Sequence, residues 1–329
     1  MDDKITATAA YRLAARRTAL LWRGDFHNAR QLLAAMARRL PDGPVRSFAD
    51  HRERQSHRAR VLGRLLIPIE PGYVVPLRRA PDVRQACLDA YGPLDQPAAI
   101  PLRDLLGLIG AHQWRLRGVP VAALDGRIHP HFGVFAPVRG EYVDLVAAMP
   151  LPQATSAIDL GTGTGVLAAV LARRGVARVI ASDVDPRALA CARDNLERLG
   201  LADRVEVVRA DLYPPGRADL VVCNPPWLPG EPISALDHAV YDPGSRMLRG
   251  FLDGLGERGG EGRLILSDLA EHLGLRSRQE LLEWIADAGL RVADRRDTRP
   301  RHPRSGNPHD PLHAARSAEI VSLWRLLPR

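Results

Sequence analysis

The sequence predicts an α/β protein, with a parallel sheet in residues 119–329 and a mostly helical domain in residues 1–118. Two observations carry this prediction. After residue 156, short apolar runs alternate with helix-like segments, which is typical of a parallel sheet joined by right-handed crossovers. Before residue 118, apolar side chains recur at helical spacing instead.

Apolar periodicity in the first domain predicts helices over Ala7–Leu40 (interrupted at Gly24), Phe48–Leu66, Pro81–Tyr91 and Leu102–Trp114. Gly24 divides Ala7–Leu40 into two helices, and the proline and glycine residues of Pro41–Pro44 are expected to end the second of them. The proline-rich segment Ile67–Pro76 is expected to be extended or turn-like.

The second domain is predicted to begin with β-hairpin material over Val119–Pro137, followed by a helix that runs to about Met149. Strands are expected at a run ending with Ile158 and at Arg178–Asp183, Arg204–Asp211, Ala218–Asn224 and Gly262–Ser267. The helices expected between and after them are Val166–Ala172, Asp185–Leu199, Met247–Leu255 and Arg276–Ala288.

The end of the chain has a different pattern. Leu290–Thr298 and Ala318–Leu327 are two strand-like segments with no helix expected between them, so they should pair antiparallel. The connecting loop, Arg299–Arg316, is long and rich in Arg, His and Pro.

Composition narrows the classes of protein that the chain can be. Its 329 residues are enough for two domains, and 46% hydrophobic with 5% aromatic residues fits a globular protein. No apolar run approaches the roughly 18 residues that span a bilayer. The start of the chain has no apolar signal core, so we expect a cytoplasmic protein without membrane contact.

Neither the cysteines nor the histidines predict a metal site. Cys87, Cys191 and Cys223 are odd in number and far apart, so they are interpreted as reduced core thiols. His129 and His131 lie close together but lack the carboxylate or cysteine company of metal ligands, and a strand-edge pair is the simpler interpretation.

The net charge of +8 is unevenly distributed. Residues 1–130 carry 21 basic and 12 acidic side chains, whereas residues 131–329 carry 25 and 26. A basic domain ahead of a nearly neutral one would suit contact with RNA or the ribosome. A solvated arginine-rich helical face would give the same pattern, so both interpretations stay open.

The glycine-rich stretch Asp159–Gly165 is the centre of the expected site. Gly161, Gly163 and Gly165, with Thr162 among them, stand between a strand and a helix. Glycines in that place allow a tight turn and let backbone N–H groups approach a ligand closely. On its own the turn would also suit a nucleotide-binding dehydrogenase or a plain tight turn.

Polar residues at the ends of the following strands extend the pattern. Asp183 is predicted to end the second strand, where a carboxylate can accept both hydroxyls of a ribose. Asp211 and Asn224 are predicted to end the third and fourth strands. Ligands of open α/β sheets bind beyond these carboxyl ends. A nicotinamide dehydrogenase would explain the glycines and Asp183, but it would not need the sequence Asn-Pro-Pro-Trp at residues 224–227.

This order of motifs resembles the class I S-adenosylmethionine-dependent methyltransferases, and within them the methyltransferase small domain group. That group includes release-factor glutamine methyltransferases and several RNA base methyltransferases. Pro137 and the following residues 139–142 are similar to the segment that those enzymes place before the glycine loop. The resemblance covers about Phe135 to the C-terminus. It implies a Rossmann-like sheet with an antiparallel C-terminal strand pair and S-adenosylmethionine as cofactor.

The resemblance also implies roles for single residues. The methionine portion of the cofactor would be held by Asp159 and the loop glycines, its ribose by Asp183 and its adenine amine by Asp211. Pro137, Thr162 and Asn224 are further candidates for cofactor binding, and residues 224–227 would hold the target. Trp227 stands where the group most often has Tyr or Phe.

The chemistry of an Asn-Pro-Pro-aromatic segment suits a planar nitrogen. An amide or exocyclic amine delocalises its lone pair and is a poor nucleophile. Acceptors at the Asn224 side chain and the Pro225 carbonyl can hold its N–H groups so that the lone pair faces the methyl group. Pro226 stiffens the backbone and Trp227 offers a flat face for stacking.

We therefore expect an N-methyltransferase acting on a planar nitrogen, with a protein glutamine side chain favoured over an RNA or DNA base amine. Two alternatives from other classes stay open. The fold could serve as a non-catalytic module that binds the cofactor and a partner, or the protein could be a nicotinamide oxidoreductase. The intact Asn-Pro-Pro-Trp sequence argues against the first, and the lack of a recognisable Tyr-Lys or His arrangement argues against the second.

Overall fold

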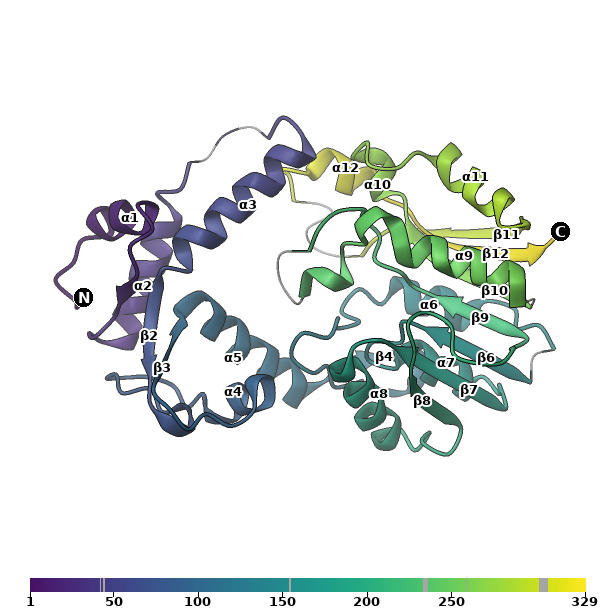
Figure 1. The fold of residues 1–329 in the computed structure, drawn as a ribbon, viewed down its shortest axis with the longest axis horizontal. Helices are drawn as coiled ribbons and strands as arrows, with labels where there is room; N and C mark the ends of the chain where they lie inside the picture. The colour runs from purple at the N-terminus through teal and green to yellow at the C-terminus, as the bar shows by residue number, and fades with distance from the viewer. Residues whose placement is uncertain (42, 44, 154, 233–235, 259, 302–306) are drawn as a thin grey trace. The chain divides into compact units, whose positions relative to one another are not determined.

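The computed structural model describes residues 1–329 except 42, 44, 154, 233–235, 259 and 302–306 (Figure 1). The chain divides into two compact units, Met1–Leu116 and Arg117–Arg329. Across the described residues, no helix is both long and apolar enough to cross a membrane. Part of the expected turn at Pro41–Pro44 and part of the Arg299–Arg316 loop lie outside the described residues.

The first unit contains the predicted helices, which are α1 Ala7–Ala15, α2 Phe26–Ala37, α3 Phe48–Leu62, α4 Arg84–Tyr91 and α5 Leu102–Arg117. Thr6, Asp25 and Ser47 stand before the first three, and each accepts a hydrogen bond from a backbone N–H of the first helical turn. Such N-caps satisfy donors that have no partner inside the helix. The helix starts are therefore encoded locally.

The first unit also contains a three-stranded sheet that the sequence analysis did not predict. Its strands lie in the order β1 Leu20–Leu21, β2 Leu65–Ile69 and β3 Ala98–Pro101. The predicted extension of α3 to Leu66 is wrong, because Leu65, Ile67 and Ile69 alternate into the core with the period of a strand. The helix ends at Leu62, with Gly63 as its C-cap.

The second unit is built on a seven-stranded sheet in the order β11-β12-β10-β9-β6-β7-β8. The strands are β6 Ser156–Leu160, β7 Arg178–Asp183, β8 Val205–Arg209, β9 Leu220–Cys223, β10 Glu261–Ser267, β11 Leu290–Thr298 and β12 Val321–Pro328. The strands from β8 to β10 pair in parallel, and β12 is antiparallel to both of its neighbours. The predicted Rossmann-like sheet and its antiparallel C-terminal pair are confirmed.

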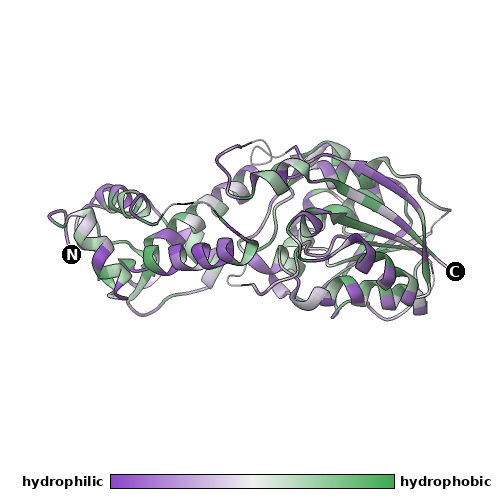
Figure 2. Ribbon diagram, turned by 90° about the horizontal axis from the view of Figure 1, so that it is seen from above, coloured by the Kyte–Doolittle hydropathy of each residue, from purple (hydrophilic) through white to green (hydrophobic). Residues whose placement is uncertain are grey.

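Helices cover both faces of this sheet. They are α6 Glu141–Ala148, α7 Val166–Arg173, α8 Pro186–Arg198, α9 Arg246–Arg258, α10 Leu269–His272, α11 Arg278–Asp287 and α12 His313–Ala318. One core cluster packs α6 and α7 on the sheet, and the other packs α9 and α11. Successive residues of β9 alternate between the two clusters, because neighbouring strand side chains point to opposite faces. In Figure 2 many strands of the sheet are green, with purple along its edge, and the helices are striped green and purple.

The edges of some elements differ from the prediction, and one predicted hairpin is confirmed. Strands β8 and β9 end at Arg209 and Cys223, so Asp211 and Asn224 follow the strands and do not end them. The segment before β12 is not helix-free, since α12 occupies His313–Ala318, an alanine-containing run without proline or glycine. The hairpin predicted within residues 119–137 is confirmed as β4 Val119–Val121 paired antiparallel with β5 Gly126–Ile128.

Candidate active site

The two motifs singled out in the sequence begin side by side. Strands β6 and β9 are parallel neighbours, and Leu160, the last residue of β6, pairs with Cys223, the last residue of β9. The glycine loop follows the first strand and residues 224–227 follow the second. The chain runs outward from β6 to β8 and then crosses to β9, so this is the switch point of the sheet, where open α/β sheets bind ligands.

The glycine loop is held by backbone hydrogen bonds to the next strand. Gly161 and Thr162 both donate from their N–H groups to the carbonyl of Ser182 at 2.9 Å. Gly165 has φ 80° and packs so closely on α8 that an added Cβ would lie 3.2 Å from Ala192 Cα. Among the described residues, a Cβ on Gly163 (φ 54°) would meet no atom within 4 Å. The space beside the Gly163 Cα is therefore open to a ligand.

Asp159 lies beneath this loop and is 1% exposed. Its Oδ2 accepts hydrogen bonds from Thr162 Oγ1 at 2.6 Å and from the N–H of Ala168 at 2.9 Å. Burial raises the pKa of the Asp159 carboxyl to about 6, although both hydrogen bonds oppose that rise. The contacts join the glycine loop to the first turn of α7, so Asp159 shapes the loop from inside.

Asp183 and Asp211 have contrasting surroundings. Asp183 is half-buried at the end of β7, and it accepts from the N–H of Gly163 and from the N–H of Asp185, each at 3.0 Å. Desolvation raises the pKa of its carboxyl. Asp211 is exposed and pairs with Arg246 at 2.6 Å. The structure thus ties Asp183 directly to the glycine loop, whereas Asp211 contacts the start of α9.

The start of α9 also contacts the glycine loop, through a residue that sequence reasoning missed. A Cβ added to Gly161 would lie 2.3 Å from Met247 Cε, so the Met247 side chain covers the loop at that point. Asp242, which is buried, accepts from the N–H groups of Met247 and Leu248 at 3.0 and 3.1 Å and so fixes the helix start. A methionine at a helix start gave no signal in the sequence.

In the Asn-Pro-Pro-Trp segment, the asparagine and the tryptophan are hydrogen-bonded to each other. Asn224 Oδ1 accepts from Trp227 Nε1 at 2.9 Å. Trp227 is half-buried and packs against both core clusters, and its carbonyl accepts from Arg276 Nη2 at 3.4 Å. Pro225 is buried and Pro226 half-buried. The segment thus continues from β9 at one end and is held by Arg276 at the other.

Arg139 joins the segment before the glycine loop to Trp227. Its guanidinium carbon lies 4.9 Å from the centroid of the Trp227 ring. The same guanidinium donates to Glu141 at 2.8 Å and to Glu319 at 3.0 Å, and these carboxylates are 1% and 2% exposed. Pro137, buried, stands two residues earlier. The resemblance pointed to this segment, but it did not point to Arg139 as a contact of Trp227.

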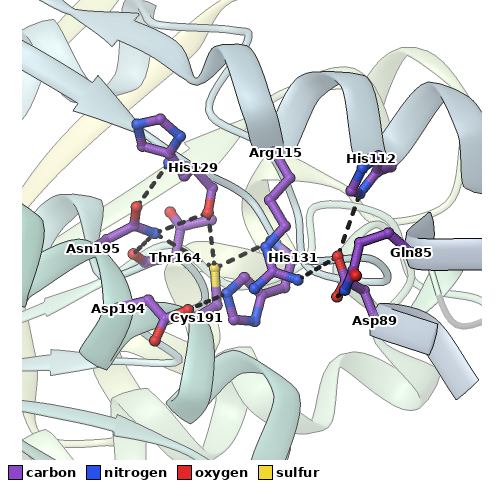
Figure 3. A network of polar contacts seen from close by, with 10 residues as sticks. All are labelled: Gln85, Asp89, His112, Arg115, His129, His131, Thr164, Cys191, Asp194 and Asn195. Carbon is purple, nitrogen blue, oxygen red and sulfur yellow. Dashed lines mark hydrogen bonds and ion pairs between the residues drawn. The ribbon is translucent and has the colours of Figure 1, made fainter. Parts of the chain in front are cut away.

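Asn195 on α8 is a further residue that sequence reasoning missed (Figure 3). It is fully buried and donates from Nδ2 to the carbonyl of Thr164 at 3.1 Å, while its Oδ1 accepts from the N–H of His129 at 2.7 Å. His131 Nε2 lies 2.8 Å from Asp194 Oδ2. Both histidines therefore fasten the chain after β5 to α8. Among the described residues no cluster of three or more potential metal ligands occurs.

Comparison with known proteins places this geometry in a family context. Residues 126–249 match the family model described as the methyltransferase small domain. A release factor glutamine methyltransferase of Cereibacter sphaeroides is 44% identical over 93 residues, which are 27% of this chain and 33% of that protein. A second one, of Gloeobacter violaceus, is 34% identical over 182 residues, or 53% and 58% of the two chains.

A ribosomal protein L11 methyltransferase of Pelotomaculum thermopropionicum is 53% identical over 68 residues, or 20% of this chain and 22% of that protein. The chain thus spans less than two thirds of the length of each of these relatives. The resemblance predicted from the order of the motifs is confirmed.

Proposed function

We propose that this protein, in which residues 126–249 match the methyltransferase small domain, transfers a methyl group from S-adenosylmethionine to a planar nitrogen. One observation carries the proposal. The glycine loop and the Asn-Pro-Pro-Trp segment follow two adjacent parallel strands at the switch point of the sheet. A methyl donor on the loop and an acceptor on residues 224–227 would therefore meet at one edge of the sheet.

The residues of the loop suit S-adenosylmethionine, which supplies an electrophilic methyl group when it is bound. The space beside the Gly163 Cα is open, so it can admit the ligand. The Asp183 oxygens accept the N–H groups of Gly163 and Asp185, and a carboxylate has further lone pairs that can accept ribose hydroxyls. Asp159 supports the loop beneath the methionine portion, and exposed Asp211 is positioned for the adenine amine beyond β8.

Residues 224–227 would align the target nitrogen. Asn224 Oδ1 and the Pro225 carbonyl accept its N–H groups, so the nitrogen lone pair is held toward the methyl group. No strong general base is required, because the nitrogen becomes acidic once it carries the additional methyl group. Catalysis then consists chiefly of alignment and electrostatic stabilisation.

A protein glutamine side chain is the favoured target. Two of the relatives described above are named for a release-factor glutamine and one for a ribosomal protein, so all three names point to protein substrates. The basic excess of residues 1–130 supports the alternative, an RNA or DNA base amine. A cofactor-binding module without catalysis would have no use for an aligned Asn-Pro-Pro-Trp segment.

Transfer of a tritiated methyl group into fractionated protein, ribosomal RNA and DNA from cells that lack the enzyme tests the proposal. We expect label in the protein fraction that survives nuclease treatment and disappears on protease treatment. Label confined to nucleic acid would select the base amine instead. Binding of S-adenosylmethionine without any transfer would favour the non-catalytic module.

A further inference from the structure

The hydrogen bond between Trp227 and Asn224 determines which way the Asn224 amide faces. An indole nitrogen only donates, so the amide atom 2.9 Å from Trp227 Nε1 must be the oxygen, and the NH2 group points elsewhere. An amide oxygen has two lone pairs, and the indole uses one of them. Asn224 therefore presents an acceptor, and not a donor, beside the tryptophan ring.

The tryptophan ring is itself held in place by a buried ionic cluster. The Arg139 guanidinium lies over the ring at 4.9 Å, a cation–π contact. Two nearly fully buried carboxylates, Glu141 and Glu319, hold that guanidinium, and Ser267 Oγ donates to the same Glu319 oxygen at 2.7 Å. Moving Arg139 away would leave buried charges unpaired, which is strongly unfavourable.

We propose that Arg139 and Trp227 form a positioning pair for the target nitrogen. Arg139 fixes the indole ring, and the indole N–H fixes the oxygen of Asn224 toward the N–H groups of the target. The inference rests on the proposed methyltransferase function and adds to it a role for the indole N–H beyond stacking. Phenylalanine at position 227 would keep a flat ring but could not orient Asn224. Arg139 acts through Trp227 and is thus a positioning residue, not a catalytic one.

The hydrogen bond can be tested without any activity measurement. The five tryptophans give five indole N–H signals in a nitrogen–proton NMR spectrum, and Trp227→Phe identifies one of them by its disappearance. Asn224→Ala removes the acceptor, so we expect the Trp227 signal to move upfield while the other four stay in place. A Trp227 signal that does not respond to Asn224→Ala would overturn the proposal.

The kinetic test separates orientation from binding. Trp227→Phe is expected to lower kcat by about five- to tenfold, as for the removal of one ordinary hydrogen bond, with unchanged affinity for S-adenosylmethionine. Arg139→Lys keeps the positive charge but removes the planar stack, so it should lower kcat and also shift the Trp227 signal. A wild-type kcat in Trp227→Phe would refute the role of the indole N–H in orienting Asn224. An unmoved Trp227 signal in Arg139→Lys would refute the role of Arg139 in fixing the ring.

The chain offers a matched control in the same unit. Arg278 lies over Trp324 at 5.2 Å and donates to Glu271 at 2.7 Å, so it repeats the arginine–tryptophan–carboxylate arrangement away from Asn224. Arg278→Lys should move the Trp324 signal and leave kcat and the Trp227 signal unchanged. An equal decrease of kcat in Arg278→Lys would show a general decrease in stability and overturn the positioning role. Absence of methyl transfer in the wild-type protein would refute the proposed function, whereas the NMR result bears on the hydrogen bond alone.

Discussion

Two carboxylates at the glycine loop, Asp159 and Asp183, act first on the backbone around them. Asp159 joins Thr162 to the N–H of Ala168, and Asp183 accepts the N–H of Gly163. Burial raises the pKa of both side chains. The shape of the loop thus depends on carboxylates whose charged forms are partly desolvated.

Asp183→Ala should weaken binding of S-adenosylmethionine by about 1–3 kcal/mol, since this substitution removes both the hydrogen bonds to a charged acceptor and the support of Gly163. Isothermal calorimetry measures the change. Asp185→Asn is the matched control, because it removes a neighbouring charge while asparagine preserves the N-cap of α8. Equal affinity in Asp183→Ala and the wild-type protein would remove Asp183 from the site. The wild-type protein and the Asp183→Ala variant should not bind nicotinamide dinucleotide.

The raised pKa of the Asp159 carboxyl predicts how the stability of the fold changes with pH. The pKa of its carboxyl is about 6 in the folded protein, against an ordinary value of 3.8, so the folded state binds the extra proton between these values. Stability contributed by protonated Asp159 is therefore present below about pH 4 and is lost as the pH rises to about 6, by up to about 3 kcal/mol. Asp159→Asn should flatten this part of the profile.

Urea unfolding at several pH values between about 4 and 7 measures the Asp159 effect. Asp219 provides a contrast of opposite sign, because hydrogen bonds from the backbone and side chain of Ser156 lower the pKa of its carboxyl. Stability from Asp219 is present above its unfolded pKa and is lost as the pH falls through the folded value. A wild-type profile that rises between pH 4 and 6 and is unaltered by Asp159→Asn would contradict the assignment.

Among the elements, α8 packs against the glycine loop and binds its backbone. Gly165 packs against Ala192, and Asn195 binds the carbonyl of Thr164 and the backbone of His129. The helix thereby joins the loop to the chain after β5, which is distant in sequence. Truncation of one buried side chain of α8 should therefore alter the conformation of the glycine loop.

Asn195→Ala is expected to destabilise the protein by about 1–3 kcal/mol for each buried backbone group left without a partner. We also expect weaker binding of S-adenosylmethionine, because the Thr164 carbonyl is no longer held. Urea unfolding and calorimetry measure the two effects. Glu197→Ala, on the exposed side of the same helix, controls for changes in helix propensity and should alter neither. Lower stability with intact cofactor affinity would show that α8 does not support the loop.

At the scale of the whole molecule, the uneven charge is the feature that bears on partners. In the first unit, α3 carries Arg52, Arg54, Arg58 and Arg60. Arg54 is paired with Asp50 at 2.9 Å, and Arg60 donates to Ser56 at 3.0 Å. Part of the basic excess is therefore engaged within the helix itself, as expected of a solvated arginine-rich face.

If the basic domain binds RNA, affinity of the full chain should fall linearly with salt on logarithmic axes. Replacing Arg52, Arg54 and Arg58 by Gln should flatten that slope by about one for each arginine that neutralises a phosphate. Arg198 and Arg291, exposed in the second unit, are the control. Weak binding with no change of slope would leave the arginines as a solvated face and favour a protein target.

Much of the fold could be predicted from local pattern. The alternation of strands and helices in the second unit follows from side-chain period, and the antiparallel C-terminal pair follows from two strand-like runs joined by a loop. The short elements were missed for a physical reason. Strand β1 has two residues and α10 four, so neither shows a full period, and β1 to β3 form a sheet only through pairing distant in sequence.

The sequence by itself determined the glycine loop, the carboxylates near the strand ends and the Asn-Pro-Pro-Trp segment, because each can be read from a short local pattern at the end of a strand. Only the tertiary structure decided which groups face them. Asn195, Met247 and the Glu319–Arg139–Trp227 chain contact the site from elements that are distant in sequence. Such contacts depend on helix packing and sheet order, and a buried ion pair between residues 180 positions apart leaves no local pattern to read.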